Sequence, residues 1–163
     1  MPNLKIQFYL KLIFVISFIS IVSAYFIQYV LGHQPCNLCL IERIPYVLCI
    51  FLIIINYKYK KEKILFLLLI LIFIFSLGVS IYHFGIEQDF FEESTICGLK
   101  DSTKIITKEE LLRQLNERVI SCKDVTFRIF GFSLTTINIF LSLILIIISI
   151  KCYKIYEKLE IKN

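Results

Sequence analysis

The sequence has few residues that interrupt helices, with five Gly and three Pro among 163 residues. Charged residues are also scarce, at 19%, whereas 58% of the residues are hydrophobic and the mean hydropathy is +0.78. A soluble domain of this length is not so apolar throughout. The composition therefore excludes an ordinary soluble domain and indicates a membrane protein.

Motifs of several enzyme and cofactor classes are missing as well. The sequence contains no Gly-rich phosphate loop, no serine nucleophile motif and no Cys-x-x-Cys-His for haem attachment. A zinc site of four cysteines is expected to have two pairs at short spacing, and only Cys36 and Cys39 have it. His33 and His83 fall at the same end of the apolar runs, so they are not placed as a haem pair across a bilayer. We expect no metal.

Four apolar runs are long enough to cross a hydrocarbon core, which takes ~20 helical residues. They cover about 12–31, 40–57, 64–82 and 130–150. The runs are continuous rather than alternating, so helices and not barrel strands are expected. The sequence thus predicts an all-α integral membrane protein, with a single domain over 1–163 that forms a bundle of four transmembrane helices.

The first run also has features of a signal peptide. Lys5 and Lys11 form a basic segment before it, and Val22-Ser23-Ala24 resembles a cleavage site. The apolar run continues to Leu31, and cleavage would remove one helix of the bundle. We expect the segment to be retained.

Basic residues outside the runs predict the orientation. They cluster before the first run, between the second and third, and after the fourth: Lys5, Lys11, Lys58, Lys60, Lys61, Lys63, Lys151, Lys154, Lys158 and Lys162. The positive-inside rule then puts both termini in the cytoplasm and the loops at about 32–39 and 83–129 outside it. The net charge of +5 is accounted for by this pattern, and no nucleic-acid partner is expected.

This topology divides the six cysteines. Four face the extracytoplasmic side: Cys36, Cys39, Cys97 and Cys122. Cys49 falls inside the second span and Cys152 just past the fourth, where we interpret both as small buried apolar residues. Disulfides persist in oxidising compartments. The four outer cysteines, an even number, are therefore the ones placed for disulfide formation and redox chemistry.

The Cys36-Asn-Leu-Cys39 segment has the features of a reactive pair. Cysteines at this spacing commonly include one with a lowered pKa, and Cys39 is predicted near a helix N-terminus, which stabilises an anion. Arg43 shares a face with Cys39 if the backbone there is already helical, but Pro45 makes the start of the helix uncertain. Arg43 and Glu42 either reach the headgroups or pair with each other, or Arg43 holds a carbonyl oxygen of a lipid-soluble ligand.

The second outer loop carries the other pair. Thr107 and Glu110 form a capping box. Apolar residues then recur at helical spacing through Ile120, which predicts a short amphipathic helix on the membrane surface. A bridge between Cys97 and Cys122 would be either a structural staple or a second redox pair.

Together these residues resemble the disulfide-bond formation protein B (DsbB) family of bacterial membrane thiol oxidases. The resemblance rests on Cys36-Asn-Leu-Cys39-Leu-Ile-Glu42-Arg43, which is similar to the family's Cys-x-x-Cys-x-x-Glu-Arg. The order of the spans, the loop cysteines, Tyr82-His83, Gly85-Ile86-Glu87 and Ile129-Phe130-Gly131-Phe132-Ser133 also match, so the likeness runs from about Leu12 to Ile150. Phe127 and Ile137 stand where family members often carry the tryptophan that this sequence lacks.

The resemblance implies a relay of electrons. A DsbA-like thioredoxin-fold protein would reduce the Cys97–Cys122 disulfide, most readily at Cys97, and this pair would exchange with Cys36–Cys39. The electrons would pass to ubiquinone or menaquinone held near Cys39 and Arg43, with His83 as a further contact. The protein would then be a quinone-dependent thiol oxidase of the bacterial inner membrane that supports disulfide formation in exported proteins.

Two other functions are compatible with the residues. One is a disulfide-stapled structural membrane protein without redox turnover. The other is a carrier that brings reducing equivalents across the membrane, which needs cysteines reachable from the cytoplasm. Only Cys152 lies near that side.

Overall fold

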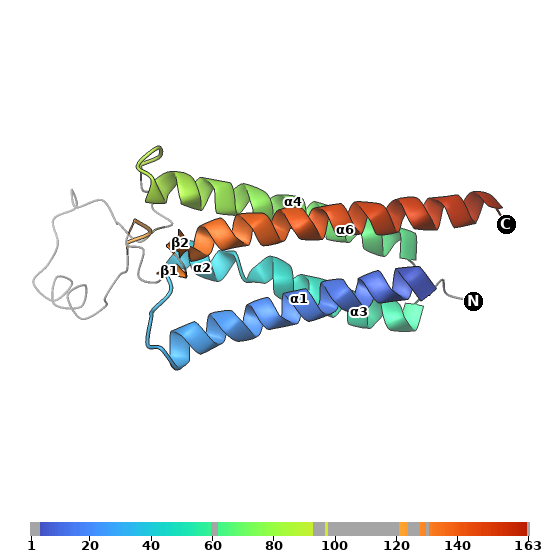
Figure 1. Ribbon diagram of the computed structural model, residues 1–163, viewed down its shortest axis with the longest axis horizontal. Helices are drawn as coiled ribbons and strands as arrows, with labels where there is room; N and C mark the ends of the chain where they lie inside the picture. Colours follow the sequence, from blue (N-terminus) through green and yellow to red (C-terminus); the bar gives the residue numbers. More distant parts are fainter. Residues whose placement is uncertain are drawn as a thin grey trace, which may run out of the picture.

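The computed structural model describes residues 4–59, 62–92, 97, 121–123, 128–129 and 131–162. Its elements are α1 (Leu4–Tyr29), α2 (Asn37–Ile41), α3 (Ile44–Tyr59), α4 (Glu62–Glu87), β1 (Arg128–Ile129), β2 (Phe132–Ser133) and α6 (Leu134–Lys162). The long helices lie side by side along one axis. Both chain termini are at one end of the bundle, and α2 and the two short strands are at the other (Figure 1).

Among the described residues, four helical segments are long and apolar enough to cross a membrane: Leu4–Tyr29, Asn37–Lys58, Glu62–Glu87 and Leu134–Ile161. Their outward faces carry large apolar side chains, of which Phe51 and Phe140 are 59% and 60% exposed. Such a surface is unfavourable in water and suited to lipid, since lipid chains are as apolar as the side chains. The predicted four-span, multi-pass membrane architecture is confirmed.

The observed helices differ in extent from the predicted spans at both ends of the bundle. At the end with the termini, α1 starts at Leu4 rather than at 12, and α6 continues to Lys162 rather than ending at 150. α4 continues to Glu87 instead of ending at 82, because its polar residues His83 and Glu87 find hydrogen-bond partners inside the bundle. The predicted outer loop is correspondingly shorter at its start. The predicted surface helix at about 107–120 lies outside the described residues.

The fourth span begins later than predicted, at Leu134 rather than at 130. A two-stranded antiparallel ladder precedes it, pairing Arg128 with Ser133 and Ile129 with Phe132. Gly131 turns the chain between the strands at φ 86°, a conformation that glycine adopts without steric cost. Ser133 Oγ then accepts a hydrogen bond from Thr136 N at 3.2 Å and caps the helix.

The second span is interrupted near the end of the bundle opposite the termini. α2 covers only five residues, Glu42 and Arg43 form a turn, and α3 starts at Ile44. Pro45 thus occupies the first turn of α3, where its missing N–H removes no hydrogen bond. Because of this turn, Arg43 does not follow Cys39 on one continuous helix.

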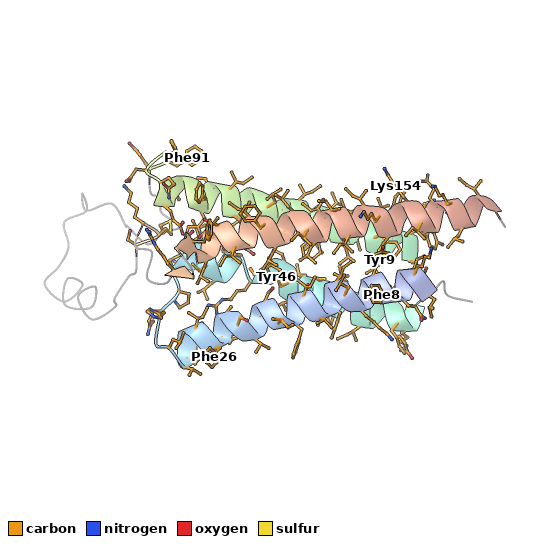
Figure 2. All side chains as sticks on the ribbon, in the orientation of Figure 1. Phe8, Tyr9, Phe26, Tyr46, Phe91 and Lys154 are labelled. Carbon is orange, nitrogen blue, oxygen red and sulfur yellow. A yellow bond between two sulfur atoms is a disulfide. The ribbon has the colours of Figure 1, made fainter. Side chains whose placement is uncertain are left out.

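The tightest pairing in the bundle is between α4 and α6. Small polar residues line this interface, with Ser76 Oγ and Ser142 Oγ 3.0 Å apart and fully buried. Asn138 Nδ2 donates to Ser80 Oγ at 2.7 Å, and Asn138 Oδ1 accepts from the Tyr46 hydroxyl. Tyr46 lies between the helices (Figure 2). Small and polar side chains let membrane helices approach closely and link them by hydrogen bonds.

Candidate redox site at the outer end of the bundle

The two cysteines of the short motif form a close pair at the start of α2. Their Sγ atoms are 3.1 Å apart, and both are free thiols. Cys36 is the N-cap residue of α2, and its Sγ accepts a hydrogen bond from Cys39 N at 3.4 Å. From the sequence, Cys39 was expected to lie near the helix N-terminus. In the structure the N-cap is Cys36, and the N–H at this helix end that comes from Cys39 is donated to the Cys36 sulfur.

Cys36 is therefore stabilised as an anion. The hydrogen bond from the Cys39 side chain lowers the pKa of Cys36 to about 4, and the hydrogen bond and charge of His83 act in the same direction. Burial opposes this effect. A thiolate is the nucleophilic form of cysteine, so Cys36 is prepared for thiol–disulfide exchange at neutral pH.

The second cysteine pair lies directly beside the first. Cys97 and Cys122 are joined by a disulfide with their Cα atoms 5.6 Å apart, and both are buried. They share one apolar cluster with Cys36, Leu38 and Ile86, against which Cys39 also packs. The structure thus brings all four predicted cysteines together, although Cys97 lies 61 positions from Cys36 in the sequence.

A histidine and a carboxylate flank the thiolate. His83 Nε2 lies 3.6 Å from Cys36 Sγ, and His83 Nδ1 lies 3.0 Å from Glu42 Oε1 and 3.3 Å from Thr135 Oγ1. From the sequence, His83 was expected to contact a ligand, and Glu42 to reach the headgroups or pair with Arg43. Both side chains are instead buried, and they bond to each other. Sequence reasoning missed the Cys36–His83–Glu42 series because its members come from α2, α4 and the turn before α3.

Glu87 belongs to the same polar group. Thr135 Oγ1 donates a hydrogen bond of 2.6 Å to Glu87 Oε1. The other carboxyl oxygen, Oε2, is buried and has no hydrogen-bond partner among the described residues. A buried oxygen without a partner is unfavourable and marks a place where a ligand or a water molecule would be bound.

The side chain of Arg43 is held by two residues of α1. Its Nη1 donates a 2.6 Å hydrogen bond to Gln28 Oε1, and its guanidinium lies 5.2 Å from the centre of the Tyr25 ring. Glu42, the partner considered from the sequence, is instead bonded to His83. Arg43 is thus kept inside the bundle end rather than extended to the headgroups.

A cavity of about 470 Å³ opens beside these groups. One wall is the apolar face of α1, with Ile16, Ile19, Ala24 and Ile27. The polar groups that line it include Cys36, Cys39, Glu42, Arg43, His83, Glu87 and Cys122. Its volume and its mainly apolar walls with a few convergent polar groups are typical of a site for an organic ligand.

This fold and site define a multi-pass membrane protein in which a reactive dithiol lies against a disulfide. Residues 7–152 match the family model of the disulfide bond formation protein DsbB, and the chain belongs to the DsbB family. The membership supports a disulfide oxidoreductase role and confirms the resemblance found in the sequence.

The chain is also similar to the "Uncharacterized protein RP370" of Rickettsia prowazekii (strain Madrid E). The two are 29% identical over 135 residues, which cover 81% of this chain and 78% of the relative. No solved structure matches the chain.

Proposed function

We propose that this protein reoxidises a DsbA-like thioredoxin-fold protein and passes the electrons to a membrane quinone. The observation that carries the proposal is the position of Cys36 between two partners. Its side chain belongs to the same buried cluster as the Cys97–Cys122 disulfide and, with Cys39, lines the apolar cavity. A thiol so placed is able to connect a protein disulfide with a lipid-soluble electron acceptor.

The first half of the reaction is thiol–disulfide exchange. A thiolate of the reduced partner attacks Cys97, releasing Cys122, and the second partner thiol resolves the mixed disulfide. The loop pair, now a dithiol, reduces a Cys36–Cys39 disulfide in the same way. Two electrons have then moved from the partner to Cys36 and Cys39, and the loop disulfide is restored.

The cavity supports a quinone as the second substrate. A quinone supplies a two-electron, two-proton acceptor, so oxidation of the dithiol to a disulfide balances its reduction to the quinol. The apolar wall from α1 suits a hydrophobic ring, and Arg43 offers a fixed cationic donor for a carbonyl oxygen. Cys39 is the more accessible thiol of the pair and is assigned to face the quinone, either ubiquinone or menaquinone.

His83 is assigned two roles in this site. Its Nε2 is close enough to Cys36 to hold the thiol proton during exchange, with Glu42 orienting the ring from the opposite nitrogen. The histidine also lines the cavity, so it is a quinone contact as well.

The orientation of the protein in the membrane is inferred from the distribution of its basic residues. The lysine-rich end with both termini faces the cytoplasm, and the end with the cysteines faces the oxidising side of a bacterial inner membrane. There the reoxidised partner introduces disulfides into exported proteins, and the quinol passes its electrons to the respiratory chain.

The test is anaerobic reduction of a short-chain quinone by the purified protein, supplied with a reduced DsbA-like protein. We expect stoichiometric quinol formation that Cys36→Ala abolishes. Cys49→Ala is the matched control. Cys49 is buried in the separate apolar core, so this variant should retain turnover. Absence of quinol, with all four outer cysteines locked in disulfides, would establish the structural staple instead.

A further inference from the structure

Three metal-ligand atoms meet beside the cavity. Cys36 Sγ, Cys39 Sγ and His83 Nε2 all lie within 4.8 Å of one another. Thiolate and imidazole are the ligands preferred by zinc and other borderline or soft cations. The sequence predicted no metal, because the four outer cysteines contain only one pair at zinc spacing and His83 is 47 positions from Cys36.

The distances are close to those of a tetrahedral zinc site. At the tetrahedral angle, Zn–S bonds of about 2.3 Å and Zn–N bonds of about 2.0 Å put a sulfur and a nitrogen ligand about 3.5 Å apart and two sulfur ligands about 3.8 Å apart. The Cys36–His83 distance is 3.6 Å and the Cys36–Cys39 distance is 3.1 Å. The two sulfur atoms would have to separate by roughly 0.7 Å to bind the ion.

The surroundings of His83 also fit a metal ligand. A histidine that binds a metal usually donates the N–H of its other nitrogen to a carboxylate or carbonyl, which fixes the ring and its tautomer. Glu42 Oε1 is 3.0 Å from Nδ1, leaving Nε2 directed at the cysteines. When deprotonated, this buried carboxylate and the two thiols would favour a cation at this point.

We propose that the reduced form of this protein binds one Zn²⁺ through Cys36, Cys39 and His83, with the fourth position open to the cavity. Binding releases the thiol protons and transfers no electron. The oxidised form lacks the two thiolates and does not bind. The metal site is inferred from geometry alone. Its consequence is inhibition of electron transfer, because a cysteine pair that holds Zn²⁺ is unable to form its disulfide. This consequence rests on the proposed function.

The test uses full-length protein with Cys97 and Cys122 both changed to Ser, so that only the site in question has outer thiols. The protein is reduced with a phosphine, desalted without oxygen and titrated with Co²⁺, whose visible spectrum reports tetrahedral thiolate coordination, and then with Zn²⁺ in competition. We expect one equivalent per chain. After oxidation of Cys36 and Cys39, the spectrum should be lost.

Two substitutions and a control locate the ligands. His83→Ala should weaken binding at least tenfold and change the spectrum, and Glu42→Gln should weaken it about tenfold, as supporting carboxylates do. His33→Ala is the matched control: it changes the other histidine of the cavity, outside the ligand group, and should leave the affinity unchanged. His83→Gln serves as a second variant if His83→Ala does not fold.

Absence of binding by the reduced protein, or equal affinity in the His83 variants, would overturn the proposal. The titration needs neither quinone nor a protein partner. A protein that binds Zn²⁺ but reduces no quinone would therefore disprove the proposed function alone, and one that reduces quinone without binding Zn²⁺ would disprove only the metal site.

Discussion

His83 Nε2 lies 3.6 Å from Cys36 Sγ, across 47 positions of sequence. The contact joins α4 to the N-cap of α2 and places a titratable ring beside the thiol that packs against the loop disulfide. Because Glu42 holds the other ring nitrogen, the imidazole is fixed relative to the thiol. The electrostatic state of Cys36 therefore depends on three separate segments of the chain.

The first prediction concerns the ionisation of Cys36. Its pKa is lowered to about 4, so the thiolate is the main form above that pH, whereas an ordinary cysteine ionises near 8.5. The ultraviolet absorbance of the thiolate in the reduced protein, taken as a difference from Cys36→Ser, should rise near pH 4 and stay level at neutral pH. A rise only above about pH 8 would contradict it.

Cys39→Ala tests the cause of this shift. The hydrogen bond from Cys39 makes the largest contribution to the low pKa of Cys36. Its removal should move the absorbance transition to higher pH. An unchanged transition would show that His83 and the helix backbone are sufficient to lower the pKa of Cys36 without the Cys39 side chain.

Arg43→Ala should weaken the use of quinone. A lost hydrogen bond from a charged donor costs roughly 1.5–3 kcal/mol, which corresponds to at least about tenfold in KM. Arg43→Lys should restore little, because the ammonium does not reproduce the fork held by Gln28 and Tyr25. The control is the rate of exchange between the reduced partner and the Cys97–Cys122 disulfide, measured by stopped flow. This rate should be the same in the variants as in the unmodified protein. If Arg43→Ala kept the KM for quinone of the unmodified protein, Arg43 would not be a quinone contact.

Asn138→Ala should destabilise the bundle. Asn138 bonds both Tyr46 and Ser80 between the helices, and interhelical hydrogen bonds in membranes contribute about 0.6 kcal/mol each on average. A loss of about 1 kcal/mol in the free energy of unfolding in detergent is expected. Tyr46→Phe should cost less, and its effect should not add to that of Asn138→Ala, because the two share one hydrogen bond. Full additivity would exclude the shared bond.

Gly85→Ala should disturb the outer end of α4. A Cβ atom at this position would collide with the ring of Phe91, which folds back on Gly85 and stacks on Tyr82 with ring centres 5.7 Å apart. Figure 2 shows Phe91 at this end of the helix. We expect a lower midpoint of thermal unfolding. Gly78→Ala is the matched control on the same helix, where nothing lies within 4 Å, and it should not lower the midpoint. Equal effects of the two changes would argue against the Phe91 contact.

Hydropathy and cysteine spacing were sufficient to predict the four spans and to single out the four cysteines that the structure brings together. Apolar runs of this length have few alternatives, and Cys36 and Cys39 are neighbours whatever the tertiary structure. The ends of the spans were harder to predict, since polar residues such as His83 and Glu87 usually indicate the end of a span. Here they continue α4 because Glu42 and Thr135 provide hydrogen bonds for them.

Contacts between distant segments were beyond the reach of local patterns. The separation of Arg43 from Glu42 depends on the turn at 42–43, which directs one side chain to His83 and the other to Gln28 on α1. The rotation of each helix about its axis decides such contacts. Residue spacing along one helix carries no information about the rotation of another.

The division of the cysteines between two clusters protects the protein from incorrect cross-linking. Cys49 and Cys152 are fully buried in the apolar core of the bundle, apart from the cluster that contains the redox pairs. Cys49 lies in α3, beyond the turn at 42–43 that separates this helix from α2 and Cys39, and it belongs to the other cluster of buried residues. If the protein turns over as proposed, exchange among the other four cysteines would proceed without trapping these two thiols in incorrect disulfides.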